Sequence, residues 1–259
     1  MKKALLISLL LFFLGLSYAQ SEKSSMIEQN AEIMAIDPQG NLYLVNDASL
    51  YKYGPEGELR YSYTNNILGN IASIDVDNPL KIMIFYRDAG IILFLNDKLA
   101  PIGDPIDIFA KGMTTISLAT YSTKNNIILF DESNTDLIIL DFYFQEKERI
   151  HYDFNEFHPF MLKDIHEKML LMQDAKQGMF FFDGFGTFEK NIALYSDYPM
   201  QWLDNQFIYI KDKQLHSYNH QKFEDVIIHD LPDNVTQTIL YRNKLFILAD
   251  KKIKIIQLP

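Results

Sequence analysis

The most regular feature of the chain is a short apolar run that ends at an aspartate and recurs six times. The runs occupy residues 41–47, 81–88, 126–131, 168–174, 206–212 and 244–250. Their aspartates are Asp47, Asp88, Asp131, Asp174, Asp212 and Asp250. From the first aspartate to the last is 203 residues over five intervals, a mean of 40.6. Short strands repeated at about 40 residues are typical of a β-propeller.

The residues around each run complete a unit of four strands. In the first unit an apolar strand precedes the turn at 38–40, and a third strand at 50–53 follows Asp47. The turn at 54–57, Gly-Pro-Glu-Gly, then leads into a fourth strand. Gly, Pro, Asn and Asp supply the dihedral angles that hairpin turns require. The pattern predicts an all-β, six-bladed propeller of four-stranded antiparallel blades over residues 20–259, with five or seven blades if one unit is misread.

The last unit has no fourth strand of its own. Its third strand, at 253–258, is followed only by Pro259, whereas residues 25–30 precede the first unit and have no place in it. We therefore expect this N-terminal segment to pair with the last blade and close the ring. Closure removes sheet edges that would otherwise invite aggregation.

One turn carries a resemblance to known propellers. The sequence Asp37-Pro-Gln-Gly40-Asn-Leu-Tyr43 is similar to the turn of NHL-type repeats, in which Asp and Gly-Asn precede a hydrophobic and an aromatic residue. With the repeated strands, the chain resembles six-bladed propellers of the NHL and TolB type over its whole length after the leader. The resemblance implies a fold, and it implies neither a substrate nor a site.

The first 19 residues have the pattern of a secretory signal peptide. Lys2 and Lys3 precede an apolar run at 4–16, and Ser-Tyr-Ala follows, which predicts cleavage after Ala19. The alternatives are a buried helix or a membrane anchor, but a membrane span needs about 20 apolar residues. The absence of cysteine leaves no lipobox thiol for a lipid anchor. We expect a periplasmic or secreted protein without membrane insertion, and its leader and composition resemble exported proteins of Bacteroidota.

Charge and cysteine content exclude several classes of function. The net charge is −10, and it becomes −12 once the two leader lysines are removed. Such a surface repels nucleic acid and anionic lipid, so we expect no nucleic-acid partner. Without cysteine, the chain has no disulfide, thiolate metal site or cysteine nucleophile.

Two groups of side chains are candidates for metal binding, and each has a simpler interpretation. The six repeat aspartates could ring one mouth of the channel and bind a cation. Aspartate also accepts backbone N–H bonds within turns, and its recurrence in every unit favours this structural role. His151, Asp153, Glu156 and His158 are close in sequence, but their spacing fits no zinc motif. We expect no metal and no cofactor.

The most unusual segment is the connection at 152–161, between the third and fourth units. It is rich in phenylalanine, and aromatic residues on a loop are candidates for a partner-binding patch. Equally, the segment could continue to pack against the third blade. The tight turn Asp183-Gly-Phe-Gly186 adds a phenylalanine that we expect to be exposed. The candidate partner-binding residues are Phe154, Phe157, His158, Phe160 and Phe185.

No sequence motif for catalysis is present, and we assign no catalytic residue. There is no Gly-x-Ser-x-Gly elbow, and the paired carboxylates are scattered. The sequence favours a non-catalytic, exported binding or scaffold protein of the cell envelope, presenting its loops to a protein partner such as an outer-membrane complex. The alternative is an enzyme or a binder of a small ligand, for example a sugar or lactone, in the central channel.

Overall fold

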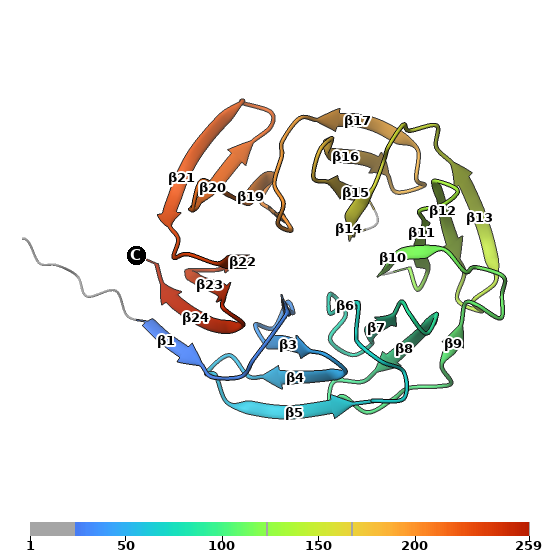
Figure 1. Cartoon of the computed structure of the whole chain (residues 1–259), viewed down its shortest axis with the longest axis horizontal. Helices are drawn as coiled ribbons and strands as arrows, with labels where there is room; N and C mark the ends of the chain where they lie inside the picture. The colour runs from blue at the N-terminus through green and yellow to red at the C-terminus, as the bar shows by residue number, and fades with distance from the viewer. Residues whose placement is uncertain (1–23, 123, 167, 259) are drawn as a thin grey trace, which may run out of the picture.

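The computed structural model describes residues 24–122, 124–166 and 168–258, and this part of the chain contains strands and turns without a helix. Six four-stranded sheets stand around a central axis as the blades of a propeller (Figure 1). The predicted fold class and the count of six blades are confirmed. The expected leader at 1–19 and its cleavage site lie outside the described residues.

In each blade the strands are ordered from the central axis of the propeller to the outer edge. The first three blades contain β2 (Ile33–Ile36), β3 (Leu42–Asn46), β4 (Ser49–Tyr53) and β5 (Leu59–Thr64); β6 (Ser73–Asp75), β7 (Ile82–Tyr86), β8 (Ile91–Leu95) and β9 (Ile106–Asp107); and β10 (Ile116–Tyr121), β11 (Ile127–Asp131), β12 (Asp136–Leu140) and β13 (Glu146–His151). The other three contain β14 (Pro159–Ile165), β15 (Met169–Asp174), β16 (Gly178–Asp183) and β17 (Phe188–Ile192); β18 (Gln201–Leu203), β19 (Gln206–Lys211), β20 (Gln214–Asn219) and β21 (Glu224–Asp230); and β22 (Val235–Tyr241), β23 (Lys244–Ala249), β24 (Lys252–Gln257) and β1 (Ser24–Ile27).

The N-terminal strand closes the ring, as the sequence predicts. β1 lies antiparallel to β24, with Ser24 opposite Ile256 and Ile27 opposite Ile253. Ile27 is buried, while the three residues before it are exposed. The first and the last described strands therefore lie side by side in the sixth blade (Figure 1).

The continuous apolar runs are explained by burial on both faces of each blade. In β7, Met83 and Phe85 pack toward the third blade, whereas Ile82, Ile84 and Tyr86 pack toward the first. Successive side chains of a strand point to opposite faces, so a strand between two neighbours must be apolar at every position. The core is accordingly divided into six clusters at the seams between blades.

Glutamine side chains fasten several of these seams near the axis. The inner strand of each blade has an unpaired edge, whose backbone groups need partners. Gln237 accepts a hydrogen bond from the backbone N–H of Met34 (2.8 Å) and donates to its carbonyl (2.7 Å), which joins the sixth blade to the first. Gln201 bonds both backbone groups of Leu240 in the same way. A side-chain amide thus takes the place of a neighbouring strand.

The described residues contain no helix with the length and hydropathy needed to cross a membrane.

Candidate functional site

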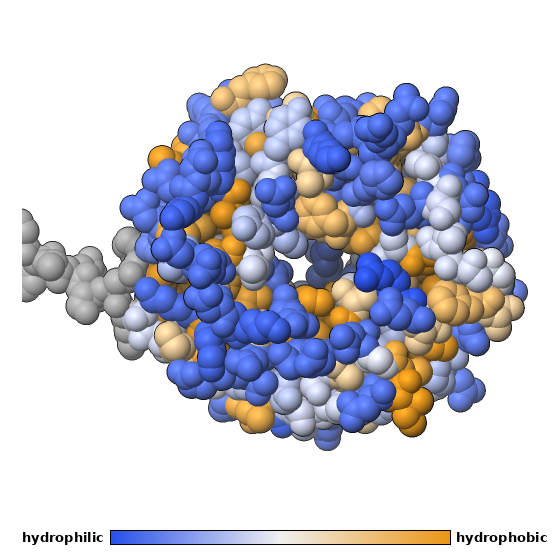
Figure 2. Space-filling view, viewed as in Figure 1, coloured by the Kyte–Doolittle hydropathy of each residue, from blue (hydrophilic) through white to orange (hydrophobic). Residues whose placement is uncertain are grey.

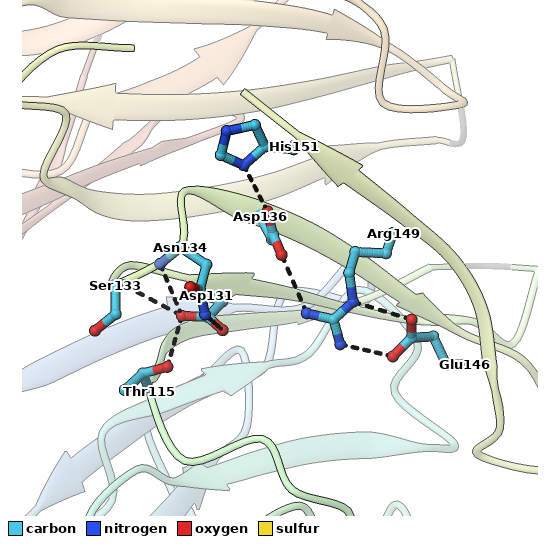
Figure 3. Close-up of polar contacts among 8 residues, drawn as sticks. All are labelled: Thr115, Asp131, Ser133, Asn134, Asp136, Glu146, Arg149 and His151. Carbon is cyan, nitrogen blue, oxygen red and sulfur yellow. Dashed lines mark hydrogen bonds and ion pairs between the residues drawn. The ribbon is translucent and has the colours of Figure 1, made fainter. Parts of the chain in front are cut away.

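Two of the six repeat aspartates organise their turns through hydrogen bonds. Asp131 is buried and accepts bonds from the backbone N–H groups of Ser133 (3.1 Å) and Asn134 (3.3 Å) (Figure 3). Asp174, also buried, accepts bonds from the N–H groups of Lys176 and Gln177. These contacts are those of a turn-forming carboxylate.

The other four repeat aspartates are exposed. Asp47, Asp212 and Asp250 have φ angles of 52°, 50° and 49°, in the left-handed region that Asp tolerates better than most residues. The Asp88 carboxylate lies 3.7 Å from the Arg87 guanidinium. Among the described residues, no three histidines or carboxylates gather closely enough to hold a metal ion.

The phenylalanines of the 152–158 connection lie in the seam between the third and fourth blades. Phe157 is 3% exposed and packs on Phe180, with ring centroids 4.5 Å apart. Phe154 is half-buried and stacks on Tyr152 at 5.2 Å. Their surroundings are those of core residues, which supports the interpretation that the connection packs against the third blade.

The remaining candidate residues do not form one patch with these phenylalanines. His158 is exposed, and its Nδ1 lies 2.9 Å from a carboxylate oxygen of Glu132. Phe160 is half-buried and lines the central channel. Phe185 is 72% exposed and lies in the turn after β16, whereas His158 bonds Asp174 before β16. Opposite ends of that strand separate the two residues, and the binding role of all five stays a prediction.

Exposed aromatic side chains recur at one turn of three successive blades. The turn between the third and fourth strands carries Phe142 and Tyr143 in the third blade, Phe185 in the fourth and Phe223 in the fifth. Their exposed fractions are 57%, 75%, 72% and 80%. Because the blades repeat around an axis, these turns occupy equivalent places on the ring. We call these four residues the rim aromatics.

The turns that carry the rim aromatics are held rigidly. Asp183 accepts hydrogen bonds from the N–H groups of Phe185 (2.8 Å) and Thr187 (2.9 Å). The bond from the Thr187 N–H, with that from Phe185, holds the pKa of the Asp183 carboxyl below its usual value. The Tyr152 hydroxyl donates to the carbonyl of Gly186 at 2.5 Å and fastens the turn to the neighbouring blade.

The third blade repeats this arrangement. Asp141 accepts bonds from the N–H groups of Tyr143 (2.8 Å) and Gln145 (3.0 Å). In the fifth blade, Asn219 accepts bonds from the N–H groups of Gln221 and Lys222, the two residues that precede Phe223. A large side chain on a fixed backbone loses little conformational entropy on binding, which favours recognition.

A charged network covers the outer strand of the third blade. Asp136 lies between Arg149 (3.1 Å) and His151 (2.9 Å), and Arg149 also pairs with Glu146 at 2.7 Å (Figure 3). The hydrogen bond with Asp136 raises the pKa of His151, which is exposed. Every one of these charges has a partner within the blade, so the four side chains form a connected surface network.

The inner strands enclose an axial cavity of about 490 Å³, which opens at the centre of the ring (Figure 2). Asp75 is buried beside it and accepts hydrogen bonds from the Thr120 hydroxyl (2.7 Å) and the Tyr121 N–H (3.2 Å). Lys163 reaches from the fourth blade to Asp77 of the second, with Nζ 2.7 Å from the carboxylate. These groups satisfy one another across the channel.

The electrostatics of this pair keep the lysine charged. Burial alone would lower the pKa of Lys163, but the carboxylates of Asp75 and Asp77 outweigh burial and raise the pKa above its usual value. A general base must lose its proton near neutral pH, so Lys163 is unsuited to that role. The described lining of the cavity includes no histidine.

Sequence reasoning found one rim aromatic and missed three. Phe185 drew attention because its turn contains two glycines, whereas Phe142, Tyr143 and Phe223 follow no glycine-rich motif. A sequence signal existed, because Asp141 and Asp183 each stand two residues before an exposed aromatic residue whose backbone N–H they bind. Lys163 and Asp77 could not be paired from sequence, because they belong to the fourth and the second blade and the whole third blade lies between them in the chain.

Comparisons with known proteins support the fold. No family model and no curated protein matches the chain. Its structure is similar to that of virginiamycin B lyase from Staphylococcus aureus, with a TM-score of 0.68 and 7% identity over 92% of this chain and 100% of that one. It is similar to BamB from Moraxella catarrhalis, with a TM-score of 0.53 and 11% identity over 91% and 96% of the two chains.

A third structural neighbour is PorZ of Porphyromonas gingivalis, an essential bacterial surface component of the type-IX secretion system. The TM-score is 0.53 at 10% identity over 92% of this chain, which spans 38% of PorZ. At such low identity these similarities establish a propeller fold, and the fold is shared by a lyase and by a bacterial surface component.

Proposed function

We propose that this protein is an exported, non-catalytic binding or scaffold propeller of the cell envelope, which presents its rim aromatics to a protein partner. The observation that carries the proposal is the recurrence of exposed aromatic side chains at one fixed turn of three successive blades. The setting that we propose is an outer-membrane complex.

Physical chemistry favours a protein partner at this rim. Aromatic residues are enriched where proteins bind one another, because each buries a large area and loses few rotamers. The net charge of −10 disfavours nucleic acid and anionic lipid, which are both negative. The likeness to PorZ, a surface component of a secretion system, gives the proposal a precedent in the same fold.

Photo-crosslinking in the source organism tests the proposal. A photoreactive phenylalanine analogue at position 185 is expected to capture a discrete protein. The same analogue at position 67, where Ile67 is 94% exposed in a loop outside the rim, provides the matched control. The variant F142S/Y143S/F185S should lose the same protein in affinity purification. Equal capture at both positions, or no capture at either, would contradict the proposal.

Export is a separate part of the proposal with its own test. Cleavage after Ala19 leaves Gln20 as the first residue of the exported protein. N-terminal peptide mapping of protein from the cell envelope should find this end, and substitution of Ala19 by Arg should block processing. A full-length protein that keeps residues 1–19 and stays in the cytoplasm would exclude export.

A second candidate is a small-ligand binder or enzyme that uses the axial cavity. The cavity volume of about 490 Å³ is in the range of ligand pockets, and the similar fold of virginiamycin B lyase shows that a propeller can carry an enzyme. Thermal-shift screening with sugars and lactones tests this candidate. A hit abolished by K163M would favour the cavity, and a hit that persists in K163M would exclude a role for Lys163 in binding.

A further inference from the structure

Each blade ends in an outer strand, and in the fifth blade this strand has an aliphatic centre between acidic ends. β21 (Glu224–Asp230) is the last strand of its sheet, so one of its edges has no neighbour within the sheet. Val226 and Ile227 in its middle are 58% and 54% exposed. Among the outer strands that the structure describes, β21 is the one with two adjacent exposed aliphatic residues.

The two aliphatic side chains lie on opposite faces of the blade. Val226 is opposite Ser217 and Ile227 is opposite His216, consecutive residues of β20. Because neighbouring side chains of a strand alternate, a strand added to this edge would find one apolar contact on each face. Phe223, which is 80% exposed, immediately precedes the strand.

The outer strand of the third blade shows what a protected edge looks like. β13 (Glu146–His151) has Glu, Lys, Glu and Arg at its first four positions, all exposed, and Ile150 is half-buried. Natural sheets use charged side chains to prevent pairing at their edges. β13 carries charges along most of its length, whereas β21 carries them at its ends and not at its centre, although both strands end blades of the same ring.

The charges around β21 indicate the chemistry of its partner. Glu224 and Asp225 lie at the start of the strand and Asp230 at its end, with the aliphatic pair between them. The Tyr209 hydroxyl donates to Asp225 (2.9 Å) and the Gln214 amide to Asp230 (2.8 Å), which fixes both carboxylates on the blade. A complementary strand has an apolar centre and basic residues at its ends.

We propose that the free edge of β21 binds an extended segment of a partner protein by strand addition, and that this segment is apolar in the middle and basic at both ends. The inference rests on the proposed function, because it names the kind of partner. A second copy of the chain fits less well, because the register that places Ile227 opposite its own copy also places Glu224 opposite Asp230. Strand addition supplies affinity through backbone hydrogen bonds and specificity through side chains.

A designed peptide tests the edge directly. A fluorescein-labelled peptide Lys-Thr-Val-Ile-Val-Thr-Arg is titrated with the purified mature protein, and binding is followed by fluorescence anisotropy. The variant V226K/I227K should bind the peptide at least about tenfold more weakly, because two charged lysine side chains disfavour the pairing of another strand with this edge. E148K on β13 changes the net charge by the same amount and should bind like the unaltered protein. Melting curves establish that each variant is folded.

Hydrogen exchange identifies where the peptide binds. Saturating peptide should slow amide exchange within residues 224–230 and leave residues 146–151 unchanged. A peptide with glutamate in place of its lysine and arginine should bind more weakly by about tenfold. No binding by the unaltered protein, equal binding by V226K/I227K, or protection elsewhere would overturn the inference. The inference would also be wrong if the unaltered protein dimerises without binding the peptide and V226K/I227K does not dimerise. The strand added to β21 would then belong to a second copy of the chain.

Capture of the partner protein by two different variants distinguishes this inference from the proposed function. The rim variant F142S/Y143S/F185S leaves β21 intact, and V226K/I227K leaves those three rim residues intact. A partner lost by the rim variant and retained by V226K/I227K would contradict the edge inference alone. Peptide binding at β21, with no partner captured at position 185, would contradict the proposed role of the rim aromatics and would support strand addition at β21.

Discussion

Two segments of the fourth blade each carry a phenylalanine, and one of these side chains is buried while the other is exposed. Phe157, in the connection before β14, is 3% exposed, and Phe185, in the turn after β16, is 72% exposed. The first lies in a seam, where the third blade covers it. The second stands on a turn that its neighbour fastens but does not cover. The comparison teaches that in a propeller the adjacent blade decides whether a loop aromatic stabilises the fold or is free to bind.

The largest expected difference between the two segments is in stability. Phe157→Ala should lower the free energy of unfolding by about 3–5 kcal/mol, because it leaves a cavity among packed rings. Phe185→Ala should change it by less than about 0.5 kcal/mol, because the side chain is exposed. Urea denaturation followed by tryptophan fluorescence measures both. Similar losses would show that the exposed turn is part of the core.

The second prediction concerns Gly186, whose carbonyl accepts the hydrogen bond from the Tyr152 hydroxyl and so links the turn after β16 to the 152–158 connection. Gly186 has a φ of 85°, and an added Cβ would lie 2.6 Å from Ile150 Cδ1 and 2.7 Å from Leu137 Cδ2. Gly57 has a φ of 88° with nothing within 4 Å of an added Cβ, so it is a matched control.

Gly57→Ala should cost about 1–2 kcal/mol for its left-handed backbone alone. Gly186→Ala should cost about 1 kcal/mol more, because the side chains at the seam must shift. Urea denaturation of the two variants gives the difference. Equal costs would mean that the turn is not packed against the third blade.

The sequence was informative about the repeat because strand and turn chemistry is local. The apolar runs, the turns and the unpaired segment at 25–30 were sufficient to predict six blades and their closure. Turn chemistry also predicted the exposure of Phe185, whose turn is too tight to bury it.

Contacts between blades were beyond the reach of sequence patterns. Gln237 and Met34 lie 203 residues apart in the chain and are joined only by ring closure. The burial of Phe157 depends on Phe130 of the preceding blade, and no local pattern records that neighbour. The edge of β21 was missed for the same reason, since Val226 and Ile227 look like core residues in the sequence.

A smaller effect should distinguish buried from exposed aspartates of the repeat. Burial tends to raise the pKa of Asp131, but hydrogen bonds from Thr115 (2.6 Å) and Asn134 (2.9 Å) outweigh it and lower the pKa below its usual 3.8. A lowered pKa in the folded state stabilises the fold above pH 3.8 and loses that contribution as the pH falls through the folded value.

Asp131→Asn should therefore cost about 1–2 kcal/mol at neutral pH, and the difference from the unaltered protein should shrink below pH 3.8. Asp88→Asn is the control, because the Asp88 side chain is 83% exposed and its substitution should change the free energy of unfolding by less than about 0.5 kcal/mol. Denaturation measured between pH 7 and pH 3 gives both profiles. A constant difference for Asp131→Asn would indicate that its carboxylate charge plays no part in the turn.

The smallest effect is expected at the exposed surface of the third blade, where a contact changes a pKa without burial. The Asp136 carboxylate, 2.9 Å from His151 Nδ1, should raise the midpoint of His151 above its usual 6.5 in an NMR titration. Because the folded pKa is raised, the attraction is present below pH 6.5 and is lost as the pH rises through the folded value. Asp136→Asn should lower the midpoint toward the usual value, because it removes the largest cause of the raised pKa. Glu146→Gln, which removes a partner of Arg149 and not of His151, should leave it raised. A midpoint unmoved by Asp136→Asn would mean that exposed contacts at this surface contribute no electrostatic interaction, and that only residues inside the seams do.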